Sequence, residues 1–331
     1  MRTTCFTTTF LLVAALLSVN STPVASASDA VFPVSVENCG IATTYTEAPR
    51  RAFAMNQSAT EIMLALGLQD RIIGTAFLDD AILPKFADAY KAIPVRSTAY
   101  PSREVLLKAQ PDFVYAAYPS AFSSELPGME DLLHSGADSY LSPSRCDNPP
   151  KVEPIEMVFR EVLEIGRIFG VPDRAQELVA ANRTDLAGVR RKLGTVKTPL
   201  RVFWWDSGMP PVVAGCCGAP NEILQMAGAQ SIFPDLRGAL GAVSWDDVIE
   251  RNPDVIVLVD ASWAPAAQKQ EWLLSNEEFS QMDAVKHRRF VTVTFSDATP
   301  GIRNIATVRK VAEALYPERF STGLARHSVS E

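Results

Sequence analysis

The sequence predicts an α/β protein with two doubly wound lobes, each built on a parallel sheet and joined by one long rigid α-helix. Three observations support this prediction: a long amphipathic stretch near the middle of the chain, two similar segments that flank it, and strands that alternate with helices on both sides. Strands and helices that alternate with short connections are typical of parallel sheets with right-handed crossovers.

The long stretch is PDRAQELVAANRTDLAGVRRKLG, residues 172–194. Pro172 suits the first turn of a helix, and Gly194 suits a C-terminal stop. At about 1.5 Å per residue such a helix is about 30 Å long, enough to act as a strut between two lobes. Its apolar residues recur at a spacing of three and four, which places them on one face: Ala175, Leu178, Val179, Leu186, Val189 and Leu193.

The two flanking segments match each other in register. The first runs from Ser102 to Asp112 and the second from Ser244 to Asp254. In each, an acid follows the serine by two residues, a Pro-Asp pair closes the segment, and an apolar run comes next. Each segment therefore predicts a capped helix, a proline stop and a buried strand. One copy is common in α/β proteins, but two copies around a long helix favour a bilobed protein.

Residues 1–27 have the pattern of a secretory signal peptide. They contain an early arginine, an apolar run from Phe10 to Val19 and a small-residue exit that ends at Ala27. The apolar run is too short for a transmembrane helix, and no later segment approaches the ~20 apolar residues that a span needs. Because Cys5 precedes the apolar run, no lipidation motif lies at the cleavage point. We expect an exported protein, periplasmic or secreted, that is soluble and not lipid-anchored.

Residues 28–150 predict the first α/β lobe. A strand at 51–55 leads into a helix with Ser58 and Glu61 as a capping box, and a strand at 71–76 follows. Further units span 102–116 and 126–141.

The rest of the chain predicts a connector, a second lobe and a tail. Residues 151–195 form a helical connector that includes the strut. Residues 196–320 form the second lobe, with strands at 200–205, 254–259 and 289–294 and helices from Pro220, Trp245 and Ile302. Residues 321–331 are expected to be a flexible tail.

The composition is that of an ordinary globular protein with a formal net charge of −7. Basic residues cluster only at 190–192 and 286–289, so the sequence indicates no nucleic-acid partner. The three histidines are too few and too scattered for a multi-histidine metal site. We expect no metal and no cofactor.

Four cysteines follow the signal peptide: Cys39, Cys146, Cys216 and Cys217. In an oxidising compartment an even number permits two disulfides, and four cysteines allow three pairings. Cys39 and Cys146 both precede the strut, so a disulfide between them is the simplest arrangement. Cys216 and Cys217 would then form a vicinal pair or remain free thiols. A metal or redox site at this pair has neither a Cys-x-x-Cys spacing nor a nearby histidine to support it.

Six features occur in order along the chain: RAFAMNQSATEIMLALGLQDRIIGTA, PSREVLLKAQPDFVYAA, the long helix, GAPNEILQMAGAQSIF, SWDDVIERNPDVIVLVD and FSDATPGIRNIATV. Together they resemble the substrate-binding proteins of ABC importers for ferric siderophores and cobalamin. The similarity extends from about Cys39 to Phe320. This resemblance implies two lobes joined by one rigid helix, a ligand in the groove between them, and delivery of that ligand to an importer.

A separate physical argument also predicts a groove. Ligands of open parallel sheets bind at the carboxyl ends of strands, and two lobes facing each other across a strut bring two such edges together. Aromatic rings and arginines at these ends suit a large ligand with oxygen acceptors. The candidates are Met55, Asn56, Phe77, Tyr100, Tyr118 and Arg145 in the first lobe, and Trp204, Trp205, Trp245, Trp263, Phe295 and Arg303 in the second. Because side chains alternate along a strand, only one of Trp204 and Trp205 should reach the groove.

The acids in the two matching segments are Glu104 and Asp246. The resemblance implies that each is presented to arginines of one subunit of an ABC permease dimer. A carboxylate in the first turn also stabilises a helix, by about 0.3–1 kcal/mol, so the two residues have a plain structural explanation as well. We expect the chain itself to be a monomer whose other partner is a small-molecule chelate.

An enzyme is disfavoured, because the sequence has no nucleophile elbow, dinucleotide fingerprint, phosphate-binding loop or His-Glu-x-x-His motif. Two alternatives remain open. One is a secreted α/β enzyme, a hydrolase or a thiol-dependent enzyme that uses Cys216 or Cys217. The other is a secreted binding protein that works without a permease.

Overall fold

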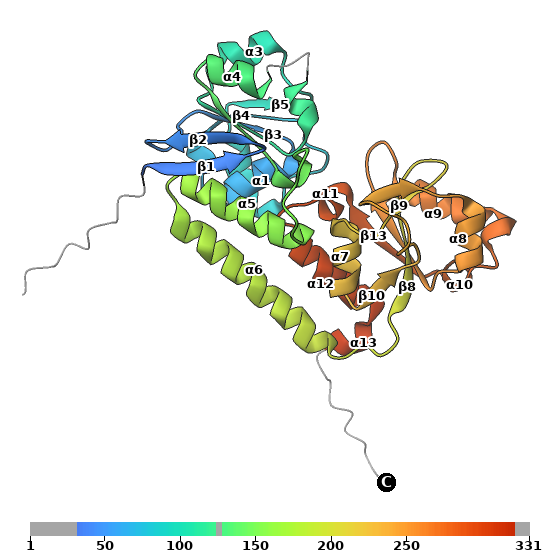
Figure 1. Cartoon of the computed structure of the whole chain (residues 1–331). Coiled ribbons are helices and arrows are strands. Elements are labelled where there is room, and N and C mark those ends of the chain that lie inside the picture. Colours follow the sequence, from blue (N-terminus) through green and yellow to red (C-terminus); the bar gives the residue numbers. More distant parts are fainter. Residues whose placement is uncertain (1–31, 124–127, 322–331) are drawn as a thin grey trace, which may run out of the picture. The chain divides into compact units, whose positions relative to one another are not determined.

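The computed structural model describes residues 32–123 and 128–321 (Figure 1). The predicted signal peptide and nearly all of the predicted tail lie outside these ranges. The described residues from Phe32 onward belong to one compact unit that contains two larger β-sheets, each accompanied by helices, and one two-stranded hairpin. The predicted α/β class is therefore confirmed, whereas the division into two lobes at particular residues remains a prediction.

The first sheet has five strands in the order β5-β4-β3-β6-β7, and every neighbouring pair is parallel. The central strand β3 and its neighbour β6 are buried along their whole length, as expected of a sheet covered on both faces. The strands are β3 (Ala52–Met55), β4 (Ile72–Ala76), β5 (Val95–Ser97), β6 (Phe113–Ala116) and β7 (Asp138–Leu141).

Short helices connect these strands. They are α1 (Gln57–Ala65), α2 (Ala87–Lys91), α3 (Arg103–Lys108) and α4 (Met129–His134), with single 3-10 turns at Gln69–Arg71, Pro84–Phe86, Pro119–Phe122 and Pro143–Arg145. The predicted capping box at Ser58 is wrong, because Asn56 is the residue that precedes α1 and Ser58 lies inside the helix.

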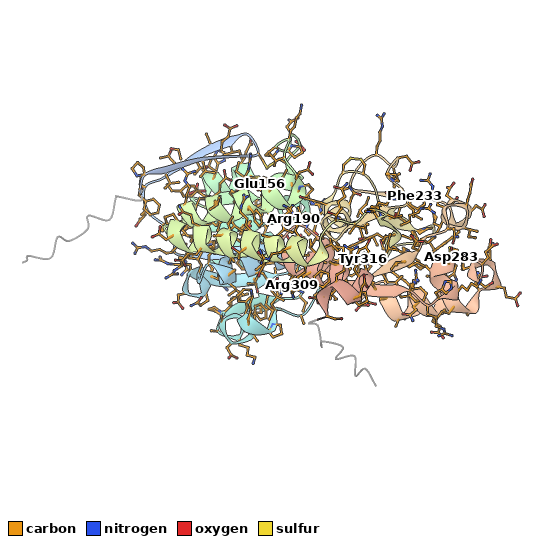
Figure 2. All side chains as sticks on the ribbon, turned by 90° about the horizontal axis from the view of Figure 1, so that it is seen from below. Glu156, Arg190, Phe233, Asp283, Arg309 and Tyr316 are labelled. Carbon is orange, nitrogen blue, oxygen red and sulfur yellow. A yellow bond between two sulfur atoms is a disulfide. The ribbon has the colours of Figure 1, made fainter. Side chains whose placement is uncertain are left out.

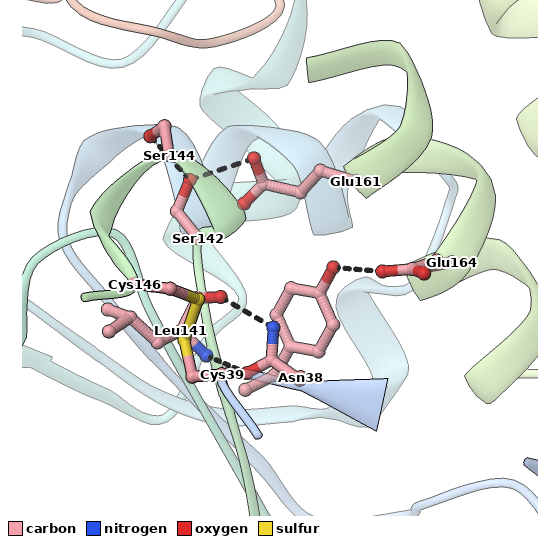
Figure 3. Close-up of a disulfide and its surroundings, with 9 residues drawn as sticks. Asn38, Cys39, Leu141, Ser142, Ser144, Cys146, Glu161 and Glu164 are labelled. Atoms are coloured by element: carbon pink, nitrogen blue, oxygen red, sulfur yellow. Dashed lines mark hydrogen bonds between the residues drawn. A yellow bond between two sulfur atoms is a disulfide. The ribbon is translucent and has the colours of Figure 1, made fainter. Parts of the chain in front are cut away.

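A hairpin that the sequence did not reveal precedes the first sheet. Strands β1 (Val34–Asn38) and β2 (Ile41–Tyr45) pair antiparallel. Cys39 in the hairpin turn forms a disulfide with Cys146, and the Asn38 side chain donates to and accepts from the backbone of Leu141 at 2.8 Å (Figure 3). The hairpin is thus fixed to the carboxyl end of β7.

The second sheet is mixed. Strand β8 (Leu200–Ser207) pairs in parallel with β12 (Val255–Asp260) and β10 (Ala229–Ser231), and β12 pairs in parallel with β13 (Phe290–Thr294). The sequence predicted this parallel part, except for β10. Two short strands, β9 (Val212–Ala214) and β11 (Leu240–Ala242), add an antiparallel edge that it did not reveal.

The helices around the second sheet begin close to where the sequence predicted. Helix α8 starts at Trp245 as expected, whereas α7 starts one residue before Pro220 and α12 two residues after Ile302. The helices are α7 (Ala219–Met226), α8 (Trp245–Arg251), α9 (Ala266–Ser275), α10 (Asp283–Lys286), α11 (Phe295–Ala298), α12 (Asn304–Leu315) and α13 (Pro317–Phe320), with a 3-10 turn at Glu277–Phe279.

The internal repeat extends to individual hydrogen bonds. Asp112, of the first Pro-Asp pair, accepts from the backbone N–H groups of Arg50 and Arg51, at 2.7 and 2.8 Å. Asp254, of the second pair, accepts from the N–H of Arg201 at 2.7 Å. The guanidinium of Arg51 in turn donates to the two carbonyls just after α3, and that of Arg201 to the last carbonyl of α8 and the one after it. The same residues therefore stabilise the same helix-to-strand junction in both halves.

The long helix α6 (Pro172–Leu193) ends where the sequence predicted, and Gly194 adopts a positive φ of 60° just beyond it. All of the predicted stripe is buried except Leu178, which is half-buried. Helix α6 packs against α5 (Pro154–Ile168) and against α12. Ion pairs join Arg183 to Glu156 of α5 and Arg309 of α12 to Asp185, and Figure 2 shows Glu156 and Arg309 on opposite flanks of α6.

At 1.5 Å per residue, α6 is about 33 Å long. Because it contacts helices that belong to each sheet, it forms a continuous link between the two halves of the chain. None of the helices in the two described ranges is both long enough and apolar enough to cross a bilayer.

Candidate functional site

A cavity of about 780 Å³ lies between the edges of the two sheets. It is lined by residues that follow strands of the first sheet, by the segment that leads into α5, and by residues that follow strands of the second sheet. They are Tyr118, Ser144, Arg145, 149–154, Met157, Asp206, 216–220, Ala239, Leu240, Phe295 and 298–300. A cavity built from two facing carboxyl-end edges is the arrangement that the sequence predicted.

Tyr118 and Arg145 form the first-sheet wall of the cavity. Tyr118 follows β6 and Arg145 follows β7, and the guanidinium carbon of Arg145 lies 4.8 Å from the centre of the Tyr118 ring. Burial raises the pKa of Tyr118 to about 12, although Arg145 and a hydrogen bond with Thr299 act in the opposite direction. Tyr118 is therefore a neutral hydroxyl at physiological pH, beside a guanidinium that keeps its charge.

Phe295 forms part of the second-sheet wall, directly after β13. Trp263 packs edge-on against it, with the ring centres 5.0 Å apart, and remains 56% exposed. Trp263 does not line the cavity. Of the twelve residues predicted for the groove, the cavity contains Tyr118, Arg145 and Phe295.

Of the three other tryptophans predicted for the groove, Trp204 and Trp205 lie in apolar cores, and the half-buried Trp245 packs against one of these cores. Trp204 and Trp205 are each only 1% exposed, and they belong to two different apolar clusters on opposite faces of β8. Trp245 packs edge-on against Trp205, with ring centres 4.9 Å apart. The expectation that one of Trp204 and Trp205 reaches the groove is wrong, because β8 is an interior strand covered on both faces.

Met55 and Asn56 lie at the predicted edge of the first sheet but are fully buried. The Asn56 side chain donates to the Tyr100 hydroxyl at 2.7 Å and accepts from the backbone of Ala117 at 3.3 Å. Tyr100 stacks on the exposed ring of Phe77, with centres 4.8 Å apart. These four residues organise the strand ends next to Tyr118 but do not line the cavity.

Arg303 is also placed differently from the prediction. It is 7% exposed, and its guanidinium binds both carboxylate oxygens of Glu61, at 2.8 and 2.5 Å. It donates as well to the backbone carbonyl of Ala81, at 2.8 Å. Its forked donors are used within the protein, so Arg303 joins the two halves and does not face a ligand.

The segment Gly215–Gly218 places a vicinal disulfide between Cys216 and Cys217 on the cavity wall. Cys217 is exposed and its N–H donates to the carbonyl of Gly238. A Cβ added to Gly215 would lie 2.5 Å from the same carbonyl oxygen, so this close approach of two loops requires glycine there. With both sulfurs paired, neither cysteine offers the free thiol that a thiol-dependent enzyme would use.

Sequence reasoning missed Asp206, the last but one residue of β8, which lines the cavity and is 8% exposed. Burial raises the pKa of its carboxyl above the usual range, against a hydrogen bond from Ser207 and the charge of Lys269. The sequence did contain a signal for Asp206: a carboxylate that directly follows two tryptophans at the end of a predicted strand is a candidate for a ligand site. The connector residues 149–154 were missed as well, because nothing in their pattern distinguishes them from an ordinary loop.

A second cavity, of about 740 Å³, lies beside the Cys39–Cys146 disulfide. It is lined by β1, by residues after β6 and β7, and by α5, and it shares Arg145, Pro150 and Met157 with the first cavity. No residue of the second sheet contributes to its wall. It is therefore a recess of the first half and not the groove between the sheets.

Among residues 32–123 and 128–321, no group of three or more histidine, cysteine, aspartate or glutamate side chains is placed to hold a metal ion. Glu104 and Asp246 are both exposed, each at the second residue of its helix. The hydroxyls of Ser102 and Ser244 cap the two helices in the same way, at 3.3 and 3.1 Å from a backbone nitrogen. The two acids therefore hold equivalent places in the two halves.

Comparison with known proteins identifies relatives of this chain. An uncharacterized ABC transporter substrate-binding lipoprotein, YvrC of Bacillus subtilis (strain 168), is 26% identical over 88% of this chain and 88% of its own length. The vitamin B12-binding protein of Vibrio parahaemolyticus is 24% identical over 72% of this chain and 83% of its own length.

The crystal structure of a periplasmic binding protein from Veillonella parvula superposes with a TM-score of 0.76 at 30% identity, covering 86% of this chain and 97% of that one. The family described as periplasmic binding protein matches residues 53–296, which include both sheets from β3 to the end of β13. The chain thus belongs to the periplasmic binding protein family.

Proposed function

We propose that this protein captures an iron-siderophore or cobalamin-like chelate in the cavity between the sheets and delivers it to an ABC importer. The observation that carries this proposal is the cavity itself, in which Tyr118 and Arg145 of one sheet edge face Phe295 of the other. Its volume lies within the range of about 300–1,000 Å³ that is usual for small-molecule sites. The relatives named as an ABC substrate-binding lipoprotein and a vitamin B12-binding protein support the class of ligand and transporter.

The cavity suits a chelate with a broad organic ligand. Its wall combines aromatic and proline surface with a neutral hydroxyl and an exposed guanidinium, which can accept large apolar area and a few oxygen acceptors together. One chain supplies both walls, so the protein can act as a monomer. The thiol-enzyme alternative is not retained, because Cys216 and Cys217 form a disulfide and the relatives are binding proteins.

Delivery requires a docking surface, and we propose that Glu104 and Asp246 provide it. Both are exposed carboxylates at equivalent places in the two halves. A permease dimer with one arginine cluster on each subunit would meet one acid from each half. We further propose that the chain is exported; N-terminal sequencing of the purified protein tests the start near Ser28 and distinguishes a free terminus from a lipid anchor like that of the YvrC lipoprotein.

Isothermal titration calorimetry with cyanocobalamin and with ferric siderophores of the hydroxamate and catecholate classes tests the proposed capture. We expect saturable binding of at least one chelate, with one ligand per chain. Native mass spectrometry of protein purified from its source then identifies the physiological ligand by mass. If folded protein binds no corrinoid or iron chelate and carries none from its source, the proposed function is wrong.

A further inference from the structure

Asp206 is a buried carboxylate near the end of β8, directly after four buried apolar residues, and it lines the cavity. Its only side-chain partner among the described residues is the Ser207 hydroxyl, which donates to Oδ2 at 3.1 Å. None of the ion pairs between described residues involves Asp206. A carboxylate can accept several hydrogen bonds, so much of the capacity of Asp206 remains free.

The end of β8 holds this carboxylate firmly in place. The pairing of β8 with β9 shifts register between Trp205 and Ser207, and such a bulge changes the direction in which a side chain points. Next to this bulge, the buried Lys269 donates to the backbone carbonyls of Asp206 and Val259, both at 2.5 Å. Its ammonium group also lies 5.6 Å from the centre of the Trp205 ring. Lys269 therefore binds the backbone at Asp206, and within the described ranges its charge acts on the carboxylate without a hydrogen bond to it.

The formal charges of the side chains that line the cavity sum to zero. Two cationic side chains, Arg145 and Lys151, are opposed by two carboxylates, Glu153 and Asp206. Arg145, Lys151 and Glu153 are exposed, whereas Asp206 is not. A charge that is screened by little water acts more strongly on a bound ligand than an exposed charge does. The carboxylate on the second-sheet wall therefore has more influence on the ligand than the formal sum of zero suggests.

We propose that Asp206 makes the cavity select a ligand that is neutral overall and that presents a hydrogen-bond donor, such as an amide or hydroxyl group, to the second-sheet wall. The same carboxylate repels polyanionic chelates, because an anion placed against it would lose water and meet a like charge. Arg145 on the opposite wall receives an oxygen acceptor of the same ligand. The inference rests on the proposed function and narrows its ligand class.

The test is calorimetric titration of wild-type protein and of Asp206→Asn with three probes: cyanocobalamin, a neutral ferric trihydroxamate and a trianionic ferric tricatecholate. We expect wild-type protein to bind one of the neutral probes at least ~100-fold more tightly than the tricatecholate. Asp206→Asn should weaken the neutral probe by about tenfold, which corresponds to ~1.4 kcal/mol, and should strengthen the tricatecholate. Asp206→Ser, which also removes the charge, should shift the preference in the same direction.

Glu313→Gln is the control, because it removes an exposed carboxylate that lies outside the cavity. It should change each affinity by less than about threefold. Equal effects of Asp206→Asn and Glu313→Gln, or a wild-type protein that prefers the tricatecholate, would overturn the role of Asp206 while leaving capture of a chelate intact. Folded wild-type protein that binds none of the probes would overturn the proposed function and this inference with it.

Discussion

Arg303, the residue directly before α12, and Glu61 of α1 form a buried ion pair that joins the second half to the first. Two nitrogens of the guanidinium bind the two carboxylate oxygens, and both side chains are almost entirely excluded from water, at 7% and 1% exposure. Next to this pair, the carboxylate of Asp80 accepts from the backbone N–H of Ser296 at 2.7 Å. Together with α6, these contacts connect the two halves at several points, which favours a groove that changes little when a ligand binds.

Arg303→Met should lower the free energy of unfolding by about 3–5 kcal/mol, because it leaves the buried Glu61 carboxylate without its counter-charge. Urea denaturation followed by circular dichroism measures the loss. Arg309→Met, six residues further along in α12, is the matched control, because the Arg309–Asp185 pair is exposed. It should cost no more than about 1 kcal/mol. Equal losses in the two variants would contradict the structural role assigned to Arg303.

Asp79 should make stability depend on pH. Burial, together with the charge of Asp80, raises its pKa to about 6. A carboxyl whose pKa is raised on folding stabilises the fold only while it is protonated, and this contribution is lost as the pH rises through about 6. Asp79→Asn should therefore stabilise the protein by about 1–2 kcal/mol near pH 7.5, after allowance for partial exposure, and should match the wild type near pH 4.

Unfolding curves at both pH values test this difference. Asp88→Asn is the control, since the Asp88 side chain is fully exposed, and it should have little effect at either pH. A gain for Asp79→Asn that is equally large near pH 4 would show that loss of the carboxylate charge is not its cause.

The two disulfides should have different roles. Cys39–Cys146 closes a long loop, with a sequence separation of 107, whereas Cys216–Cys217 joins adjacent residues and closes almost none. Replacing Cys39 and Cys146 with serine should lower the free energy of unfolding by about 2–5 kcal/mol, because the unfolded chain gains freedom. Replacing Cys216 and Cys217 should change unfolding little but weaken ligand binding, since that disulfide lines the cavity. The opposite pattern, in urea denaturation and calorimetry, would contradict this assignment.

If Glu104 and Asp246 dock the protein to a permease, replacing them should abolish transport without changing ligand binding. In the double variant Glu104→Ala with Asp246→Ala, chelate affinity should remain as in the wild type, and stability should fall by only about 0.3–1 kcal/mol per residue. Uptake, or binding to the reconstituted permease, should be lost. Glu177→Ala with Glu313→Ala removes two exposed acids elsewhere and should leave uptake unchanged. Full uptake by the first variant would mean that these acids serve only to stabilise their helices.

Local patterns predicted the elements that depend on local chemistry. The three-and-four spacing, Pro172 and Gly194 defined α6 to within a residue. The Pro-Asp segments predicted matching helix-to-strand junctions from their shared residue pattern, although the N–H groups that Asp112 and Asp254 bind, those of Arg50 and Arg201, lie far away along the chain. Short antiparallel strands such as β9 and β11 were not predicted, since three residues are too few to show alternation.

Contacts between distant parts of the chain were not predictable in this way. Arg303 was expected in the groove, but its partner Glu61 lies 242 residues away, and no local signal links the two. Trp204 and Trp205 were expected to divide between core and groove. The alternation itself is correct, but the structure covers both faces of β8, so both rings are buried. Exposure of a strand face depends on which helices cover it, and a strand sequence does not contain that information.

The most direct test of the proposed site is to fill the cavity. Ala239 is exposed and lines the cavity wall, so Ala239→Trp should occupy ligand space without disturbing a core. Ala267 on α9 is equally exposed but lies outside the cavity, and Ala267→Trp is the control. Calorimetric titration with a chelate that the wild type binds should show at least ~100-fold weaker binding to Ala239→Trp and wild-type affinity for Ala267→Trp. Undiminished affinity in folded Ala239→Trp would contradict a ligand site between the two sheets.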